Sequence, residues 1–139
     1  VTDIALVAAQ IAPVYPEKAE IFDAIAAATI TAGQALYFDS AGKVNLADAN
    51  GSGTLQFRGI ALNGGGAGQA ISVLKKGHCY GFTVSGVAYD AALFLSNTAG
   101  AFGDSAGATS INCARVVALP DSSLTKVTYI EADWLRTWS

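Results

Sequence analysis

Apolar and polar residues alternate along much of the chain with a period of two, which is typical of β-strands. The clearest case lies at residues 80–85, where Tyr80, Phe82 and Val84 alternate with glycine, threonine and serine. Short apolar runs bounded by glycine, asparagine and aspartate occur elsewhere, and such residues favour turns. The pattern predicts strands at 35–38, 57–62, 70–74, 80–84, 92–95, 115–119 and 126–130. Many short strands joined by glycine-rich turns indicate an all-β domain, either a small β-sandwich or a barrel-like fold.

Two of these segments recur further along the chain. Ala35-Leu-Tyr-Phe38 returns as Ala92-Leu-Phe-Leu95, and Arg58-Gly-Ile-Ala-Leu62 returns as Arg115-Val-Val-Ala-Leu119. Two copies are too few for a solenoid, which needs at least three units to bury its faces. We therefore expect one compact domain with internal pseudo-symmetry. Its two pseudo-repeated units would span about 29–77 and 86–130.

The first residues do not belong to the repeat. The apolar residues at 4–9 suit an extended strand, in which Ile4, Leu6 and Ala8 would face one side and the three residues between and after them the other. Pro13 and Pro16 then block continuation of the strand. A poorly charged strand at a chain end is usually docked, either on its own sheet or on a neighbour's. We divide the chain into an extended N-terminal arm, a β domain and a C-terminal tail, at 1–16, 17–131 and 132–139.

The segment at 17–28 supports two interpretations. Pro16 before an acidic turn favours the start of a helix, and Ile21 and Ile25 would share one helical face. The run Ile21-Phe-Asp-Ala-Ile25 also fits a short strand. Intrinsic propensity prefers the helix, but periodicity alone does not decide between the two.

Three aromatic side chains near the chain ends have two interpretations each. Trp134 and Trp138 in the tail would share a face in either a helix or a strand, and tryptophan is enriched at interface hot spots. The alternative is that they close the domain's own core. Tyr15, which lies between two prolines, has the same two interpretations.

The composition limits the kinds of partner. Of the 139 residues 52% are hydrophobic and 14% are charged, which is well below the usual quarter. A small domain so poor in charge either has a large core or hides surface against partners. The net charge of −3 and the scattered basic residues argue against nucleic acid. No apolar stretch is long enough to predict a membrane span.

No residue pattern predicts catalysis, a cofactor or a bound metal. His78 is the only histidine, and with Cys79 and Cys113 it lacks the number and spacing of zinc ligands. The sequence leaves open whether the two cysteines are bonded. The glycine-rich loop at 63–68 lacks the lysine and the following helix of a phosphate-binding loop. The acidic residues fall in turns, where aspartate normally caps backbone amides. The sequence therefore predicts a protein that is not an enzyme.

An ordered set of segments resembles the capsid decoration (cement) proteins of tailed bacteriophages. The resemblance covers most of the chain, but the segment at 17–27 and the C-terminal tail depart from the family pattern. The segments that carry it are Thr2-Asp-Ile-Ala-Leu6, Ala28-Thr-Ile-Thr-Ala-Gly-Gln-Ala-Leu-Tyr37, Gly42-Lys43, Leu46-Ala-Asp-Ala-Asn50, Arg58-Gly-Ile-Ala-Leu-Asn63, Gly68-Gln69 and, more weakly, Ala92-Leu-Phe-Leu-Ser96 and Thr98-Ala-Gly100.

The resemblance implies a fold, a location and partners. The fold would be a β-tulip domain, and the protein would lie on the outer surface of the capsid in the virion. It would bind the major capsid protein and itself, typically as a homotrimer at three-fold and quasi-three-fold positions, and would stabilise the expanded shell by bridging neighbouring subunits. No cofactor, nucleic acid or membrane is implied.

We expect the contacts with capsid or sister subunits to come from the arm and the tail. The candidate contact residues are Ile4, Leu6, Val7, Ile11, Val14, Tyr15, Trp134 and Trp138. The alternative function is a β-sandwich module for glycan binding or host adsorption on the particle. In that case Tyr15, Trp134 and Trp138 would form a stacking platform for sugar rings.

Overall fold

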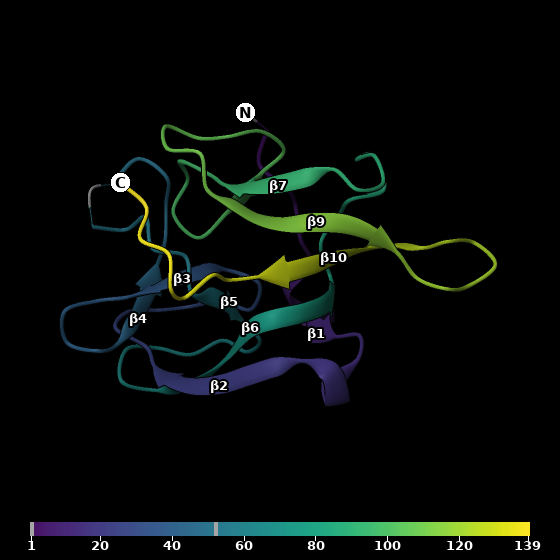
Figure 1. Ribbon diagram of the computed structural model, residues 1–139. Helices are drawn as coiled ribbons and strands as arrows, with labels where there is room; N and C mark the ends of the chain where they lie inside the picture. The colour runs from purple at the N-terminus through teal and green to yellow at the C-terminus, as the bar shows by residue number, and fades with distance from the viewer. Residues whose placement is uncertain (1, 52) are drawn as a thin grey trace.

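The computed structural model describes residues 2–51 and 53–139 and is all-β (Figure 1). No α-helix occurs among these residues, and the only helical turns are two short 3-10 segments at Ala8–Gln10 and Pro16–Lys18. No helix in this part of the chain is therefore long and apolar enough to cross a membrane. The strands are β1 (Ala12–Pro13), β2 (Glu20–Ile25), β3 (Ala35–Phe38), β4 (Val44–Leu46), β5 (Gly59–Ala61), β6 (Ala70–Tyr80), β7 (Ala92–Leu95), β8 (Phe102–Gly103), β9 (Asn112–Ala118) and β10 (Lys126–Glu131).

The strands form one curled antiparallel sheet, a half-barrel, in the order β4-β3-β5-β6-β10-β9-β7-β8. The order is symmetric: β4-β3-β5-β6 from one end corresponds to β8-β7-β9-β10 from the other end. The two halves meet where β6 and β10 run antiparallel, with His78 opposite Tyr129. Two copies of one unit would produce such an order, and the duplication itself stays a prediction from the sequence.

Strand β6 is the longest, with 11 residues, and organises the sheet. Leu74 pairs with both Ile21 and Ile60, so β2 and β5 lie on opposite edges of β6. Lys76 pairs with both Glu20 and Glu131, so β10 also lies opposite β2. Strands β5 and β10 therefore follow one another along one edge of β6, while β2 occupies the other edge.

Two hydrophobic cores form on the two faces of β6. Val73 and Leu74 are neighbours in the strand and point to opposite faces. Leu74 belongs to the larger core, where Phe102 contacts Phe57 and Phe82 with ring centroids 5.6 and 5.5 Å apart. Val73 belongs to the smaller core, which lies between β6 and the β3–β4 hairpin. The other buried members of the smaller core are Ala26, Ile30, Leu36, Val44, Ala61 and Ile71.

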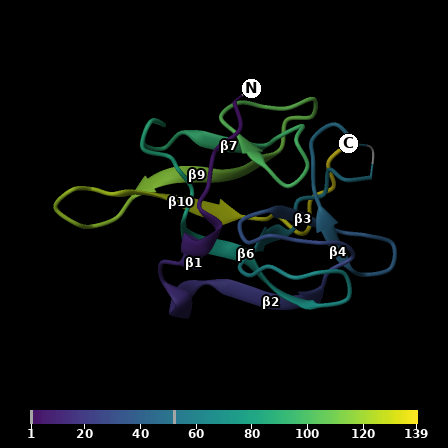
Figure 2. The same ribbon diagram turned by 180° about the vertical axis from the view of Figure 1, so that it is seen from behind.

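The N-terminal arm is bound to its own domain. Figure 2 shows it running from beside β7 across β9 and β10 to β1. The Ile4 N–H donates to the Phe102 carbonyl oxygen and the Val7 N–H donates to the Gly81 carbonyl oxygen, each at 2.8 Å. Ile4 and Leu6 also pack against the larger core. The arm therefore covers part of this core, and its backbone groups pair within the chain.

Ile11 is the residue of the arm that is buried in the core of the domain. Its side chain is 7% exposed and packs against Gly33 and Gly81. Both glycines have positive φ, at 92° and 103°, and a Cβ atom at Gly81 would lie 2.6 Å from the Ile11 Cδ1 atom. Only glycine meets both requirements easily, because other residues are strained at such φ values.

The ambiguous segment at 17–28 is a strand over Glu20–Ile25, preceded by the 3-10 turn. Local propensity favoured a helix, but β6 offers an edge on which this segment pairs from Lys76 to Ala70. Tertiary pairing overrides a weak helix preference. The strand predicted at 80–84 was wrong: β6 ends at Tyr80, and the residues after it form only the isolated Leu6–Phe82 bridge with the arm.

Candidate interaction surface

An aromatic cluster lies where β2, β3 and the C-terminal tail meet. Phe22, Phe38 and Trp134 contact one another, with ring centroids 4.8 Å apart for Phe22–Trp134, 5.6 Å for Phe38–Trp134 and 5.9 Å for Phe22–Phe38. Phe38 is still 37% exposed and Trp134 is 36% exposed. The cluster is thus held in place by its own packing and offers ring surface to a partner, as interface hot spots do.

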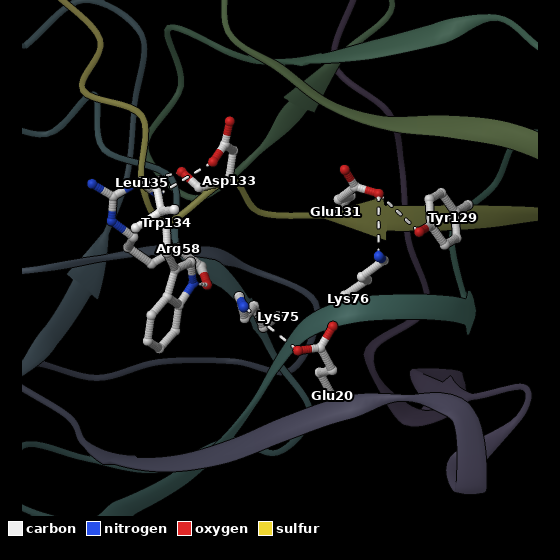
Figure 3. A network of polar contacts seen from close by, with 9 residues as sticks. All are labelled: Glu20, Arg58, Lys75, Lys76, Tyr129, Glu131, Asp133, Trp134 and Leu135. Carbon is white, nitrogen blue, oxygen red and sulfur yellow. Dashed lines mark hydrogen bonds and ion pairs between the residues drawn. The ribbon is translucent and has the colours of Figure 1, made fainter.

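Several polar contacts orient Trp134 (Figure 3). Its indole Nε1 donates to the Arg58 carbonyl oxygen at 2.9 Å, and the Lys75 Nζ lies 5.1 Å from the ring centroid. Lys75 also pairs with Glu20 at 3.5 Å. The Arg58 guanidinium donates to the Asp133 carbonyl oxygen at 3.1 Å. Burial lowers the pKa of Arg58, and the negative charge of Asp133 opposes that shift.

Trp138 belongs to the domain's own core. It is 7% exposed, and its backbone is held by the side chain of Gln56. The two tryptophans predicted to act together therefore have different surroundings: Trp134 lies at the surface and Trp138 is buried. Leu135, between them in sequence, is 98% exposed.

Strand β2 adds a second apolar feature beside the aromatic cluster. Ile21 and Ile25 are 42% and 43% exposed, on the face of the strand opposite to Phe22. Asp23 lies between them on the same face and accepts a long hydrogen bond of 3.4 Å from the Ser72 hydroxyl. Strand β2 pairs with β6 along one edge, and directly after it Ala26 forms a parallel bridge to Val44 of β4 on the other edge.

A row of aromatic rings crosses β1, β6 and β10. Tyr15 lies edge-on to His78 at 5.2 Å, and His78 lies 5.1 Å from Tyr129. Burial and the nearby Lys18 charge lower the pKa of His78. Burial, followed by the hydrogen bond from its hydroxyl to Glu131, raises the pKa of Tyr129 to about 12. Tyr15 therefore packs within the chain and is separate from the tryptophan cluster.

Some of the arm residues predicted to contact a partner lie in the chain's own core, and others lie at the surface. Ile11 is buried in the chain's own core, so this side chain, like that of Trp138, is not accessible for the contact predicted for it. Ile4 and Leu6 are half-buried against the larger core, and Val7 is 47% exposed. Val14 is half-buried, and its N–H donates to the His78 carbonyl oxygen at 2.9 Å.

The cysteines and the turn aspartates have structural surroundings. Cys79 and Cys113 are buried and unbonded to each other, which answers the question that the sequence left open. Burial raises the pKa of both thiols, that of Cys79 to about 12. Asp39, Asp48 and Asp121 each accept hydrogen bonds from backbone amides of their own turns, as predicted.

The surface has shallow hollows. One of about 280 Å³ lies beside Tyr129, between β9, β10 and the tail, and is also lined by Arg115, Glu131, Arg136 and Trp138. Within residues 2–51 and 53–139, no group of three or more histidine, cysteine, aspartate or glutamate side chains is arranged to hold a metal ion.

Phe22, Phe38, Ile21 and Ile25 are surface residues that the sequence reasoning did not select. For three of them, the sequence at 20–25 contained the information needed. If this segment is a strand, both isoleucines lie on one face and Phe22 lies on the other. The preference for a helix in this segment left that two-faced arrangement unconsidered.

The fold and surface define a small all-β half-barrel with exposed apolar side chains around β2 and the tail. No family model matches the chain, and the comparisons with curated proteins and with solved structures find no match either.

Proposed function

We propose that the protein is a structural, non-enzymatic decoration (cement) protein of a tailed-bacteriophage head. It binds the outer surface of the expanded capsid and bridges neighbouring subunits of the major capsid protein. The ordered sequence segments that resemble this family support the proposal, together with the low charge content. The same resemblance motivates a homotrimer at three-fold and quasi-three-fold positions.

The observation that carries the proposal is the apolar surface around β2, β3 and the tail. A soluble domain seldom leaves large apolar side chains grouped at its surface unless a partner covers them. Burying such area contributes roughly 25 cal/mol per Å² before the costs of association. The residues concerned are Ile21, Ile25, Phe38, Trp134 and Leu135.

The rigid attachment of arm and tail suits a bridging role. Because both ends are hydrogen-bonded to the half-barrel, binding would order few further residues, and this limits the entropic cost. Several modest contacts made by one oligomer would act together, and the effective affinity would exceed that of each contact alone by about 10² or more.

Co-sedimentation tests the proposal. Purified protein is mixed at micromolar concentration with undecorated, expanded heads of the phage that encodes it, and with unexpanded heads as a comparison. We expect the protein to pellet with the expanded heads. Protein that stays in the supernatant with both kinds of head would contradict the proposal.

A pair of variants links binding to the apolar surface. Trp134→Ala combined with Phe38→Ala should reduce pelleting strongly. Leu124→Asn is the matched control, because Leu124 is 52% exposed in the β9–β10 hairpin, away from the cluster, at a φ of 47° that asparagine tolerates. It should leave binding unchanged.

The aromatic row motivates the alternative, a glycan-binding module. Tyr129 borders the hollow of about 280 Å³, where arginine and carboxylate side chains could hydrogen-bond sugar hydroxyls. The platform first predicted is not formed, because Trp138 is buried and Tyr15 packs against His78. Saturation-transfer NMR against a glycan panel tests this alternative, and a panel without any signal removes it.

A further inference from the structure

Leu135 is the most exposed large hydrophobic side chain among the described residues, with 98% of its surface open to solvent. It lies in the turn that follows β10, beside Trp134 (Figure 3). A single exposed leucine is common on proteins and gives little information by itself. This leucine differs because the chain holds its turn in place and forms a hollow next to it.

Hydrogen bonds from Arg58 fix the turn that carries Leu135. The Arg58 guanidinium donates to the carbonyl oxygens of Asp133 and Arg136, at 3.1 and 3.3 Å. The Arg58 carbonyl oxygen accepts from the Trp134 indole at 2.9 Å. The Leu135 N–H donates to the Asp133 carboxylate at 3.2 Å, which closes the turn. Leu135 is thus presented in one position, and a partner that buries it would order few further atoms.

A hollow of about 360 Å³ adjoins this turn, between β2, β6 and the tail. Trp134 forms one wall, and Phe22, whose ring centroid lies 4.8 Å from that of Trp134, forms another. The residues that line the hollow are Ala19, Glu20, Ile21, Phe22, Lys75 and Trp134. Because Trp134 lines the hollow and directly precedes Leu135, one surface of the molecule carries both a projecting leucine and a recess with aromatic walls.

Opposite charges stand beside the leucine and beside the hollow. Arg136 is exposed next to Leu135, and no ion pair engages it within the described part of the chain. Glu20 lies at the hollow, and its side chain is 54% exposed although the Lys75 Nζ is 3.5 Å away. A second copy that brings its Leu135 into the hollow would therefore set its Arg136 beside Glu20. Complementary charges of this kind fix the register of a contact.

We propose that Leu135 of one copy inserts into the Trp134 hollow of a second copy, with Arg136 paired to Glu20 across the contact. The buried leucine contributes affinity, and the ion pair sets the orientation. A contact between two unlike patches repeats around a ring when the rotation closes. The inference deepens the proposed function and rests on it for the number of copies, because it names the contact that would join the subunits of the homotrimer.

The contact is small, so the free protein should associate weakly. Each interface buries one leucine and parts of two aromatic rings, which is far less than the roughly 800 Å² per partner of a stable complex. On the capsid, binding to the shell would hold neighbouring copies close together and strengthen the contact. Ile25 and Phe38 are exposed and do not line the hollow, so they remain for the capsid.

Sedimentation of the free protein tests the contact with no capsid present. Analytical ultracentrifugation over a series up to about 1 mM should show association that increases with concentration. Leu135→Asn should weaken this association at least about tenfold, because the inserted side chain is lost. Leu124→Asn is the matched control, since it makes the same change at an exposed leucine in the β9–β10 hairpin, and it should associate like the unaltered protein. Thermal unfolding of both variants checks that the fold is retained.

A charge exchange tests the orientation of the contact. Arg136→Glu should weaken association about three- to tenfold, because it places two carboxylates together. Adding Glu20→Arg to that variant should restore association, since the pair is then reversed and still complementary. Lys126→Glu is the control, because it makes the same change in net charge at the opposite end of β10. It should leave association unchanged.

The outcomes separate this inference from the proposed function. A protein that stays monomeric up to about 1 mM, or an association that Leu135→Asn and Leu124→Asn leave equally strong, would overturn the inserted leucine. A monomer whose binding to heads still depends on Leu135 would also overturn it, because the capsid would then be the occupant of this contact. Association that depends on Leu135, in a protein that fails to pellet with expanded heads, would support the inference and contradict the proposed function alone.

Discussion

The side-chain amide of Gln56 pairs with the backbone of Trp138 in the manner of a neighbouring strand. Its Nε2 donates to the Trp138 carbonyl oxygen at 2.7 Å, and its Oε1 accepts from the Trp138 N–H at 2.9 Å. Because Trp138 is buried, these backbone groups have little access to water. A single side chain thus replaces the ladder partner that the last residues lack.

Gln56→Ala should therefore destabilise the protein. Leaving two buried backbone groups without a partner should lower the free energy of unfolding by about 1–3 kcal/mol. Gln56→Glu should have an intermediate effect at neutral pH, because a carboxylate can accept from the Trp138 N–H but cannot donate to its carbonyl. Urea unfolding followed by circular dichroism measures both variants. Gln10→Ala, at an exposed position, is the control, and equal stability of Gln56→Ala and Gln10→Ala would contradict the prediction.

The arm offers a matched pair of substitutions. Ile11→Ala empties a site packed against Gly33 and Gly81 and should lower the free energy of unfolding by about 2–5 kcal/mol. Val7→Ala, at a side chain that is 47% exposed, should change it by no more than about 0.5 kcal/mol. Chemical denaturation of both variants measures the difference. Similar small effects for both would mean that the arm is only loosely attached to the domain.

Strand positions with strong local patterns could be predicted from the sequence. Ala35–Phe38 and Ala92–Leu95 have the predicted boundaries, because apolar runs between turn residues have few alternatives to a buried strand. The segment Glu20–Ile25 could not be assigned, since its state depends on the edge that β6 provides, and no local pattern contains that information.

The candidate surface was harder to predict than the fold. Trp134 and Trp138 have the same residue type, and their partners Arg58 and Gln56 lie far away in the sequence, so no local pattern shows which of the two is buried. The exposure of Phe38 depends likewise on its position at the end of β3, beside the tail. Contacts between residues far apart in sequence therefore decided what local patterns left open.

The two cysteines should be unreactive in the folded protein. Burial raises the pKa of Cys79 to about 12 and that of Cys113 in the same direction, so almost no thiolate is present at pH 8. A disulfide reagent should modify neither thiol until denaturant is added. Ser122→Cys, at an exposed position in the β9–β10 hairpin, should add one promptly reacting thiol as a control. Rapid modification of the unaltered protein would contradict this prediction.

Stability should decrease when the pH falls through the titration range of His78. Its folded-state pKa lies below the ordinary histidine value of about 6.5, because burial and the charge of Lys18 disfavour the imidazolium ion. The unfolded chain therefore binds more protons in this window, so the melting temperature should be constant above about pH 7 and fall as the pH drops below about 6.5. His78→Gln should remove this slope, because His78 is the only histidine. A melting temperature that rises on acidification to about pH 5.5 would contradict the sign.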